Sequence, residues 1–342
     1  MKLFMPERVF FEPAALRYPL GKHLLDYFSK TDAEIKQLPL NSIAKNIPGS
    51  GPREKYAQSK KTLAVVVKKT TPLDTCKPSA DYEFSLVSNC PGNCEYCYLQ
   101  TTQGQNPYLR VYVNLEDIHA NIKNHILQNG NKITVFEAAS LGDPLALEHL
   151  TGSLAKTVEF FGTLDNGRLR TVTKYANVDS FLNLRHNGHT RFRFTINSRH
   201  VIESFEHNTS GFAERLDAAA KIAASGYPTG FIIAPLMIYE GWKEEYLELL
   251  DRLKAKMPDT KAVEPLTFEL IQHRYTPTAK KYILERFPNT KLDMEESQRM
   301  LKWGRFGRFK YVYPKNQADE IKEHITGLIM ERFPDARIEY FT

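Results

Sequence analysis

The chain has 342 residues, of which 42% are hydrophobic and 25% charged, and its formal net charge is +6. These values are ordinary for a globular protein, and the length is sufficient for a large core. No apolar run approaches the ~18 residues that a membrane span needs, so the sequence argues against a membrane protein. The positive charge is a mild indication of a polyanionic partner.

The N-terminal residues and the cysteines both indicate the cellular compartment of the protein. The first residues, MKLFMPERVFFEP, lack the apolar core and the small-residue cleavage site of a signal peptide. Three of the four cysteines lie in one short stretch, which favours a reducing compartment over a disulfide framework. We therefore expect a cytoplasmic protein with no membrane partner.

Residues 1–80 contain helix-like and strand-like pieces, such as Thr62–Val67, and a basic stretch with several Gly and Pro residues. We interpret them as an N-terminal extension packed on the main domain. From Tyr82 the pattern becomes strand, loop and helix, repeated. Asn114 is expected to cap a helix that ends at Gly130 and buries one face, formed by Leu115, Ile118, Ile122 and Ile126.

Six short apolar strands are predicted between residues 81 and 288, with helix-like segments such as Ala213–Ala224 between them. The strands are Phe84–Val87, Ile133–Phe136, Leu169–Thr173, Phe192–Ile196, Phe231–Ile233 and Leu266–Leu270. Alternation of this kind predicts an α/β fold of parallel strands with right-handed crossovers. Residues 289–342 break the alternation with a basic, aromatic segment and a helix over Ile321–Phe333, which indicates C-terminal α+β additions.

Three cysteines occur within eight residues, as Cys90-Pro-Gly-Asn-Cys94-Glu-Tyr-Cys97. Three thiolates are one short of the four that close a structural zinc site or a conventional iron–sulfur cluster. The incomplete set suggests a metal centre with an open position. The alternative is a zinc knuckle completed by a distant histidine or by Cys76, although zinc loops usually pair their cysteines as two C-x2-C units.

The C-x3-C-x2-C spacing, with Tyr96 before the last cysteine, resembles the cluster loop of the radical S-adenosylmethionine (SAM) superfamily. Further blocks resemble the spore photoproduct lyase family: Cys94–Thr102, Arg110–Asn114, Glu148–Thr151, Arg191–Phe194, Phe268–Arg274 and Lys302–Arg305. The resemblance runs from Phe11-Glu-Pro to Tyr340-Phe-Thr342, which is nearly the whole chain. It implies an open (β/α)6 partial TIM barrel over residues 81–288, with the cysteines on a loop at the carboxyl end of a strand.

The resemblance implies the cofactors and the reaction. Cys90, Cys94 and Cys97 would hold a [4Fe–4S] cluster whose fourth iron binds the amino and carboxylate groups of SAM. A one-electron reductant such as flavodoxin or ferredoxin would reduce the cluster, and SAM would yield a 5′-deoxyadenosyl radical. In this family of bacterial DNA-repair lyases, used at spore germination, the radical removes hydrogen from C6 of 5-thyminyl-5,6-dihydrothymine and two thymines are restored.

The sequence departs from the family pattern at the residue that returns a hydrogen atom to the thymine radical. Most members have cysteine where this chain has Ser140, whose O–H bond is far too strong for that step. Our hypothesis is that Cys76 supplies the thiol; otherwise Cys76 is a small buried hydrophobic residue, as unreactive cysteines usually are.

The remaining site residues follow from the same resemblance. Tyr96 and Tyr98 would relay the radical between that thiol and SAM, or Tyr96 would stack on the cofactor or simply pack. SAM contacts would come from Tyr96, Tyr98, Ser140, Asp143, Lys174 and Thr195. Gly142 stands where the family has a serine, which removes one hydroxyl contact.

The resemblance implies that a basic and aromatic segment contacts DNA, with its cations on phosphates and an aromatic beside a damaged base step. Taken alone, such a segment would more often be a solvated hairpin. The segment contributes Lys302, Trp303, Arg305, Arg308 and Lys310, and His273 and Arg274 are expected to touch the lesion. The lesion must leave the duplex stack to be reached. Two alternatives stay open: a radical SAM enzyme with another nucleic-acid or peptide substrate, and a DNA-binding protein with a structural metal site.

Overall fold

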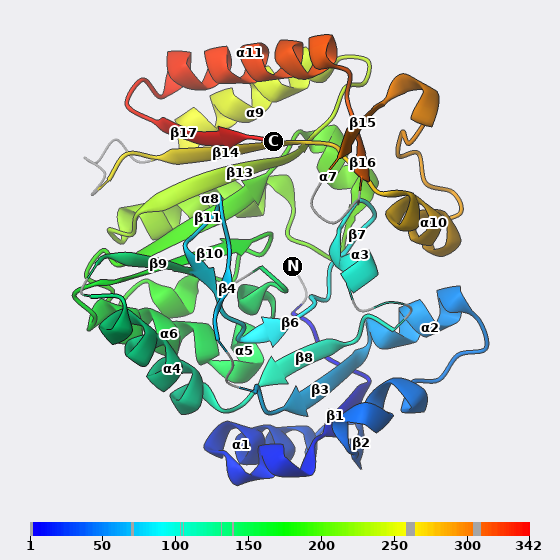
Figure 1. The fold of residues 1–342 in the computed structure, drawn as a ribbon, viewed down its shortest axis with the longest axis vertical. Coiled ribbons are helices and arrows are strands. Elements are labelled where there is room, and N and C mark those ends of the chain that lie inside the picture. Colours follow the sequence, from blue (N-terminus) through cyan, green and yellow to red (C-terminus); the bar gives the residue numbers. More distant parts are fainter. Residues whose placement is uncertain are drawn as a thin grey trace. The chain divides into compact units, whose positions relative to one another are not determined.

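The computed structural model describes residues 3–69, 72–102, 104, 106–130, 132–138, 140–257, 264–303 and 309–342 (Figure 1). The chain forms two compact units. The first unit comprises Met1–Pro91, Thr101–Thr173 and Asp179–Arg191, and the second unit comprises Gly92–Gln100, Lys174–Val178 and Phe192–Thr342. The predicted arginine contacts Arg305 and Arg308 lie outside the described residues.

The first unit contains a sheet with the strand order β2-β1-β3-β8-β6, which is parallel except for the last pair. Its strands are β1 (Arg8–Phe11), β2 (Glu34–Gln37), β3 (Thr62–Val66), β6 (Val87–Ser88) and β8 (Leu109–Tyr112). All five residues of β3 are buried, which explains its unbroken apolar sequence. The predicted strand at Thr62–Val67 is thus confirmed, and its partners include a strand from beyond residue 80.

A second group of strands in the first unit runs β10-β9-β5-β4. These strands are β4 (Asp74–Thr75), β5 (Tyr82–Glu83), β9 (Thr134–Glu137) and β10 (Gly167–Thr173). The first unit also contains α1 (Pro19–Phe28), α2 (Pro52–Ser59), α4 (Leu115–Gln128), α5 (Glu148–Thr151), α6 (Ser153–Gly162) and the 3-10 turns Pro13–Arg17, Leu40–Asn46, Pro144–Leu147 and Asp179–Phe181. Parallel pairing of β9 with both β10 and β5 agrees with the predicted α/β class.

Helix α4 buries the four residues predicted to form its inner face: Leu115, Ile118, Ile122 and Ile126. Asn114 occupies the N-cap position as predicted, but its side chain makes no capping hydrogen bond to the helix backbone. Its amide instead accepts from the Lys68 backbone N–H at 2.8 Å and donates to the Lys68 carbonyl at 2.9 Å. Asn114 therefore ties the start of α4 to the segment that follows β3.

The second unit contains the parallel strands β11-β13-β14-β17. Its elements are β7 (Asn93–Cys94), β11 (Thr190–Ile196, which begins in the first unit), α7 (Arg199–Phe205), β12 (Glu206–His207), α8 (Phe212–Ala224), β13 (Thr229–Leu236), α9 (Trp242–Lys256), β14 (Thr267–Gln272), α10 (Pro277–Arg286), the 3-10 turn Glu296–Gln298, β15 (Met300–Trp303), β16 (Phe309–Val312), α11 (Lys315–Arg332) and β17 (Arg337–Phe341). Helix α3 (Leu99–Thr102) begins in this unit and ends in the first.

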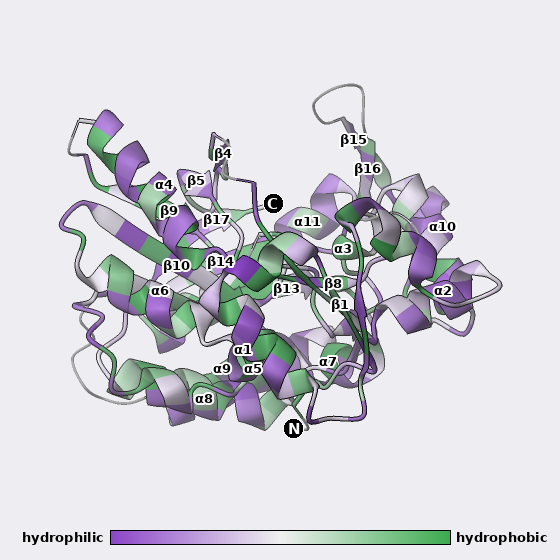
Figure 2. Cartoon of the chain, turned by 90° about the horizontal axis from the view of Figure 1, so that it is seen from below, coloured by the Kyte–Doolittle hydropathy of each residue, from purple (hydrophilic) through white to green (hydrophobic). Residues whose placement is uncertain are grey.

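Helices α9 and α11 lie side by side along β14 and β17 (Figure 1). Figure 2 shows hydrophobic and hydrophilic residues alternating along α8, as expected of a helix that buries one face including Leu216, Ala219 and Ile222. The helix predicted over Ala213–Ala224 is confirmed as α8, which begins one residue earlier. The helix predicted over Ile321–Phe333 is confirmed as α11, although it begins six residues earlier, at Lys315, and ends at Arg332. Among the described residues, no helix combines the length and apolarity needed to cross a membrane.

Five of the six strands predicted for the barrel are confirmed as β9, β10, β11, β13 and β14. The first, Phe84–Val87, is wrong as a single strand. Tyr82–Glu83 pairs with β9, whereas Val87–Ser88 pairs antiparallel with β8 in the other sheet. An apolar run identifies buried residues but not their sheet. Here the run Phe84–Val87 connects one sheet to the other.

Candidate functional site

The second and third cysteines of the loop are anchored in the second unit. Strand β7 pairs antiparallel with β12, so that Cys94 lies opposite Glu206 and Asn93 lies opposite His207. His207 Nε2 contacts Glu95 Oε1 at 2.8 Å, and Cys94 is only 4% exposed while Cys97 is half-buried. Two short strands therefore fix the loop around Cys94, although neither was predicted from the sequence.

The first cysteine is anchored in the first unit by the residue before it. Asn89 adopts a left-handed backbone conformation with φ 65°, which Asn tolerates better than most residues. Its side-chain oxygen accepts from the Cys90 backbone N–H at 2.9 Å. Its carbonyl oxygen would lie 2.6 Å from a Cβ added to Gly142, so the glycine allows this close approach.

The donor set suits an iron–sulfur cluster. No disulfide joins the four cysteines, all of which belong to the described residues. Thiolates are the usual ligands of such clusters, and three of them leave one iron open to another ligand. Within the described part of the chain no three His, Cys, Asp or Glu side chains gather as a metal site, so the assignment rests on spacing and chemistry.

The second unit also holds a buried charged network beside the loop. The Glu206 carboxylate accepts hydrogen bonds from the Tyr96 hydroxyl and from Arg215, and Lys174 Nζ lies 3.3 Å from it. The Glu206 and Arg215 side chains are fully buried. Lys174 Nζ also lies 5.6 Å from the centre of the Tyr96 ring. Two predicted site residues, Tyr96 and Lys174, are thus brought together by a carboxylate.

The pKa directions in this network have clear causes. Burial alone would raise the pKa of Glu206, but the Arg215 and Lys174 charges outweigh it and the pKa is lowered. Burial, followed by the Glu206 charge, raises the pKa of Tyr96 well above its usual value. Tyr96 is therefore a neutral phenol that donates to an ionised carboxylate. Sequence reasoning missed Glu206 and Arg215, because a buried charged pair leaves no spacing signature.

The other predicted SAM contacts divide between the units. In the first unit Asp143 is buried and accepts from Thr173 Oγ1 at 3.0 Å, and Ser140 is half-buried. In the second unit Thr195 is buried on β11, where its carbonyl accepts from Arg215 at 3.0 Å. Tyr98 is 58% exposed, unlike Tyr96.

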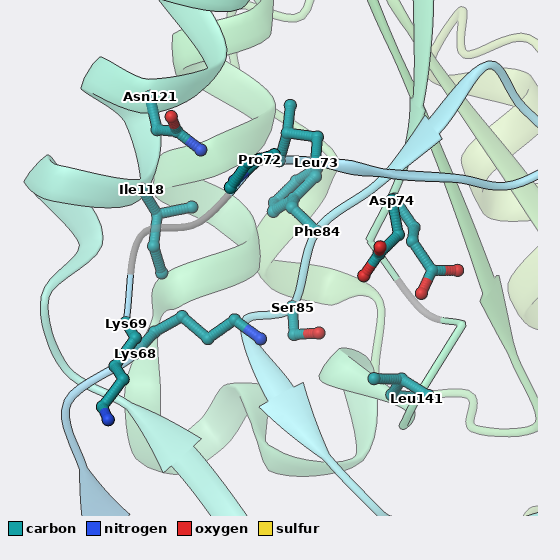
Figure 3. Close-up of a pocket in the computed structure, with 11 residues that line it drawn as sticks. Lys68, Lys69, Pro72, Leu73, Asp74, Phe84, Ser85, Ile118, Asn121 and Leu141 are labelled. Atoms are coloured by element: carbon teal, nitrogen blue, oxygen red, sulfur yellow. The ribbon is translucent and has the colours of Figure 1, made fainter.

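A small pocket of the first unit is bordered by the segments that carry Cys76, the candidate hydrogen donor, and Ser140. Asp74 lies two residues before Cys76, Leu141 directly follows Ser140, and both line the pocket (Figure 3). Lys68 and Lys69 lie at its other side. The Cys76 turn is fixed by its own N–H, which donates to the Asp81 carbonyl at 3.2 Å.

The described residues of the basic and aromatic segment form two antiparallel strands, β15 and β16. Lys302 lies opposite Lys310, and Trp303, which is 68% exposed, lies opposite Phe309 with ring centres 5.5 Å apart. The pKa of Lys310 is lowered by partial burial and then by the charges of Arg274 and Lys302. Three of the predicted DNA-contacting cations are therefore neighbours.

His273 differs from the other predicted lesion contacts because it is buried. Only 2% of it is exposed, and burial, with the nearby Arg299 charge, lowers its pKa to about 3. Its ring lies 5.7 Å from that of Tyr275, which stacks on Tyr311 of β16 at 5.3 Å. Tyr96 packs against the apolar cluster to which Tyr275 belongs, and so does Tyr311. One cluster of the second unit thus supports both the cysteine loop and the β15–β16 pair.

Comparisons with known proteins agree over the whole chain. The family model described as spore photoproduct lyase matches residues 4–342. The chain is 48% identical to a spore photoproduct lyase of Geobacillus sp. (strain Y412MC61) over 342 residues, covering 100% of both chains. It is 44% identical to that of Bacillus subtilis (strain 168), covering 99% of both.

Solved structures give the same result. A spore photoproduct lyase complexed with dinucleoside spore photoproduct superposes with a TM-score of 0.96 at 48% identity, with full coverage of both chains. A mutant of such a lyase with bound AdoMet (SAM) and dinucleoside spore photoproduct also gives 0.96. By sequence and by fold, the chain belongs to the spore photoproduct lyase family.

Proposed function

We propose that the chain is a DNA-repair lyase that reverts 5-thyminyl-5,6-dihydrothymine to two thymines. Full-length membership in the spore photoproduct lyase family carries this proposal. The related solved enzyme binds dinucleoside spore photoproduct, which is the lesion proposed as substrate here. When bound and reduced, the [4Fe–4S] cluster and SAM supply the 5′-deoxyadenosyl radical that starts the reaction.

The cysteines Cys90, Cys94 and Cys97 would hold the cluster. Lys174 has an ammonium group and Asp143 a carboxylate, which suit the carboxylate and the charged amine or ribose hydroxyls of SAM. Thr195 and Ser140 offer hydroxyls, and the aromatic rings of Tyr96 and Tyr98 offer faces for stacking. The pairing of Lys174 with Glu206 supports this role, because it holds a long flexible cation beside the cysteine loop.

Cys76 would return the hydrogen atom to the thymine radical. A thiol S–H bond is weak enough for this step and the Ser140 O–H bond is not. Tyr96 and Tyr98 would connect the thiol with SAM as radical relays.

The lesion would be held by the β15–β16 pair together with Arg305 and Arg308, two predicted contacts that lie outside the described residues. Lys302, Lys310 and Arg274 would contact phosphates, and Trp303 would wedge beside the damaged step. His273, being buried and neutral, would stabilise the site through its packing beside Tyr275. A flavodoxin or ferredoxin would supply the electron.

In architectural terms we propose the (β/α)6 partial barrel over residues 81–288, with residues 1–80 as an N-terminal extension and residues 289–342 as the DNA-contacting addition. The parallel order β11-β13-β14 and the parallel pairing of β9 with β10 support this arrangement.

The experiment is anaerobic turnover of reconstituted Cys76→Ala with SAM, dithionite and dinucleotide spore photoproduct. We expect SAM cleavage to persist while clean thymine is lost to by-products. The matched control is Cys76→Ala/Ser140→Cys, which restores a thiol at the position usual in the family and should recover thymine. Normal thymine yield from Cys76→Ala would eliminate Cys76 as the donor while leaving the lyase assignment intact.

A further inference from the structure

A buried lysine of the first unit contacts the first cluster cysteine. Lys60 follows directly after α2 and is only 8% exposed. Its Nζ donates to the Cys90 carbonyl at 2.8 Å and to Asn89 Oδ1 at 3.2 Å. Burial of an ammonium group is costly unless it is well hydrogen-bonded, so these contacts indicate why the fold keeps Lys60 inside.

The acceptor Asn89 is itself rigidly held. It is 1% exposed, and its side-chain nitrogen donates to the Pro107 carbonyl at 2.9 Å. Its backbone N–H donates to the Leu141 carbonyl at 2.6 Å. The amide oxygen of Asn89 thus receives both the Cys90 N–H and the Lys60 ammonium. Lys60 and Asn89 together fix the Cys90 backbone through its N–H and its carbonyl.

We propose that Lys60 is a positioning residue for Cys90 and that its positive charge raises the reduction potential of the cluster. Reduction adds an electron to the cluster, and a nearby buried cation stabilises the more negative state because the surrounding dielectric is low. This inference rests on the proposed function, since it requires the cluster to be present. It gives the predicted N-terminal extension a direct part in the chemistry.

The chain offers a matched control in the next residue. Lys61 carries the same charge, but its side chain is 50% exposed and its Nζ lies 2.7 Å from Glu7. Removal of either lysine changes the net charge equally, whereas only Lys60 contacts Cys90. A surface charge is screened by solvent and salt, so it affects a buried group far less than a buried charge does.

The test is a redox titration of the anaerobically reconstituted full-length protein, followed by electron paramagnetic resonance of the reduced cluster. We expect a more negative midpoint potential in Lys60→Met, and potentials unchanged from wild type in Lys60→Arg and Lys61→Met. A Lys60→Met protein with full iron content and the wild-type potential would overturn the inference. Wild-type protein that assembles no cluster would instead overturn the proposed function.

Asn89→Asp keeps the test decisive if Lys60→Met fails to retain iron. Aspartate tolerates the left-handed conformation of residue 89 and places a negative charge against Lys60. We expect this variant to assemble the cluster with a potential shifted to more negative values. A wild-type potential in iron-loaded Asn89→Asp would overturn the electrostatic role of Lys60.

Discussion

Replacement of Glu206 by glutamine should strongly destabilise the second unit. The substitution leaves the shape of the side chain but removes the charge that faces Arg215, whose side chain is 0% exposed. Breaking a buried ion pair by neutralising one partner costs about 3–5 kcal/mol, because the other charge stays buried without compensation. Lys174, at 3.3 Å, loses a second favourable contact.

The assay is anaerobic urea unfolding followed by tryptophan fluorescence. Trp242 is buried and lies in the second unit, so it reports on the correct part of the chain. The matched control is Glu203→Gln, because Glu203 is 66% exposed and lies 3.8 Å from Arg199. Such a surface pair contributes about 0.5 kcal/mol or less. If Glu206→Gln lowered the free energy of unfolding by less than about 0.5 kcal/mol, the reasoning would be refuted.

The remaining predictions concern pH, packing and DNA. Because the folded-state pKa of His273 is lowered from 6.5 to about 3, the unfolded chain binds the extra proton first and stability should fall as the pH falls below 6.5. Between pH 7 and pH 5 the free energy of unfolding of His273→Leu, measured in urea, should fall by about 2 kcal/mol less than that of the wild type. An equal fall in the two proteins would contradict this. Gly230→Ala should lower the stability measured by thermal denaturation by about 1–3 kcal/mol, because the added Cβ would lie 2.3 Å from Thr267 Oγ1. Gly51→Ala, with no atom within 4 Å, is the control, and equal melting temperatures would count against the packing argument. Trp303→Ala should weaken binding of lesion-containing duplex roughly tenfold in a fluorescence-anisotropy titration while SAM cleavage is unchanged, and unchanged binding would exclude Trp303 from the interface.

Much of the fold followed from periodicity. The buried face of α4 and the five apolar strands β9, β10, β11, β13 and β14 appear where the pattern predicted them. The pattern failed at Phe84–Val87, because continuous apolar sequence reports burial and carries no information on which sheet a residue joins. The sequence placed the cap of α4 correctly at Asn114 but not the hydrogen bonds of its side chain, since the side chain of a cap residue can bond outside its helix.

Some residues of the candidate site were likewise predictable from the sequence and others were not. The cysteines and Tyr96 are close in sequence, so spacing identified them. Glu206 and Arg215 come from elements far from the loop and meet it only through folding, and neither belongs to a motif. Lys60 lies 30 residues before Cys90, and a lysine of a basic stretch is interpreted as a surface charge until its burial is known. Buried charges beside a cofactor loop are set by tertiary structure, which a single sequence does not display.

The most direct test of the central claim is anaerobic turnover of the reconstituted wild-type protein with dithionite, SAM and dinucleotide spore photoproduct, followed by chromatography of thymine products and 5′-deoxyadenosine. The account predicts that the lesion is converted to two thymines with SAM cleavage. Cleavage of SAM with the lesion left unchanged would contradict it.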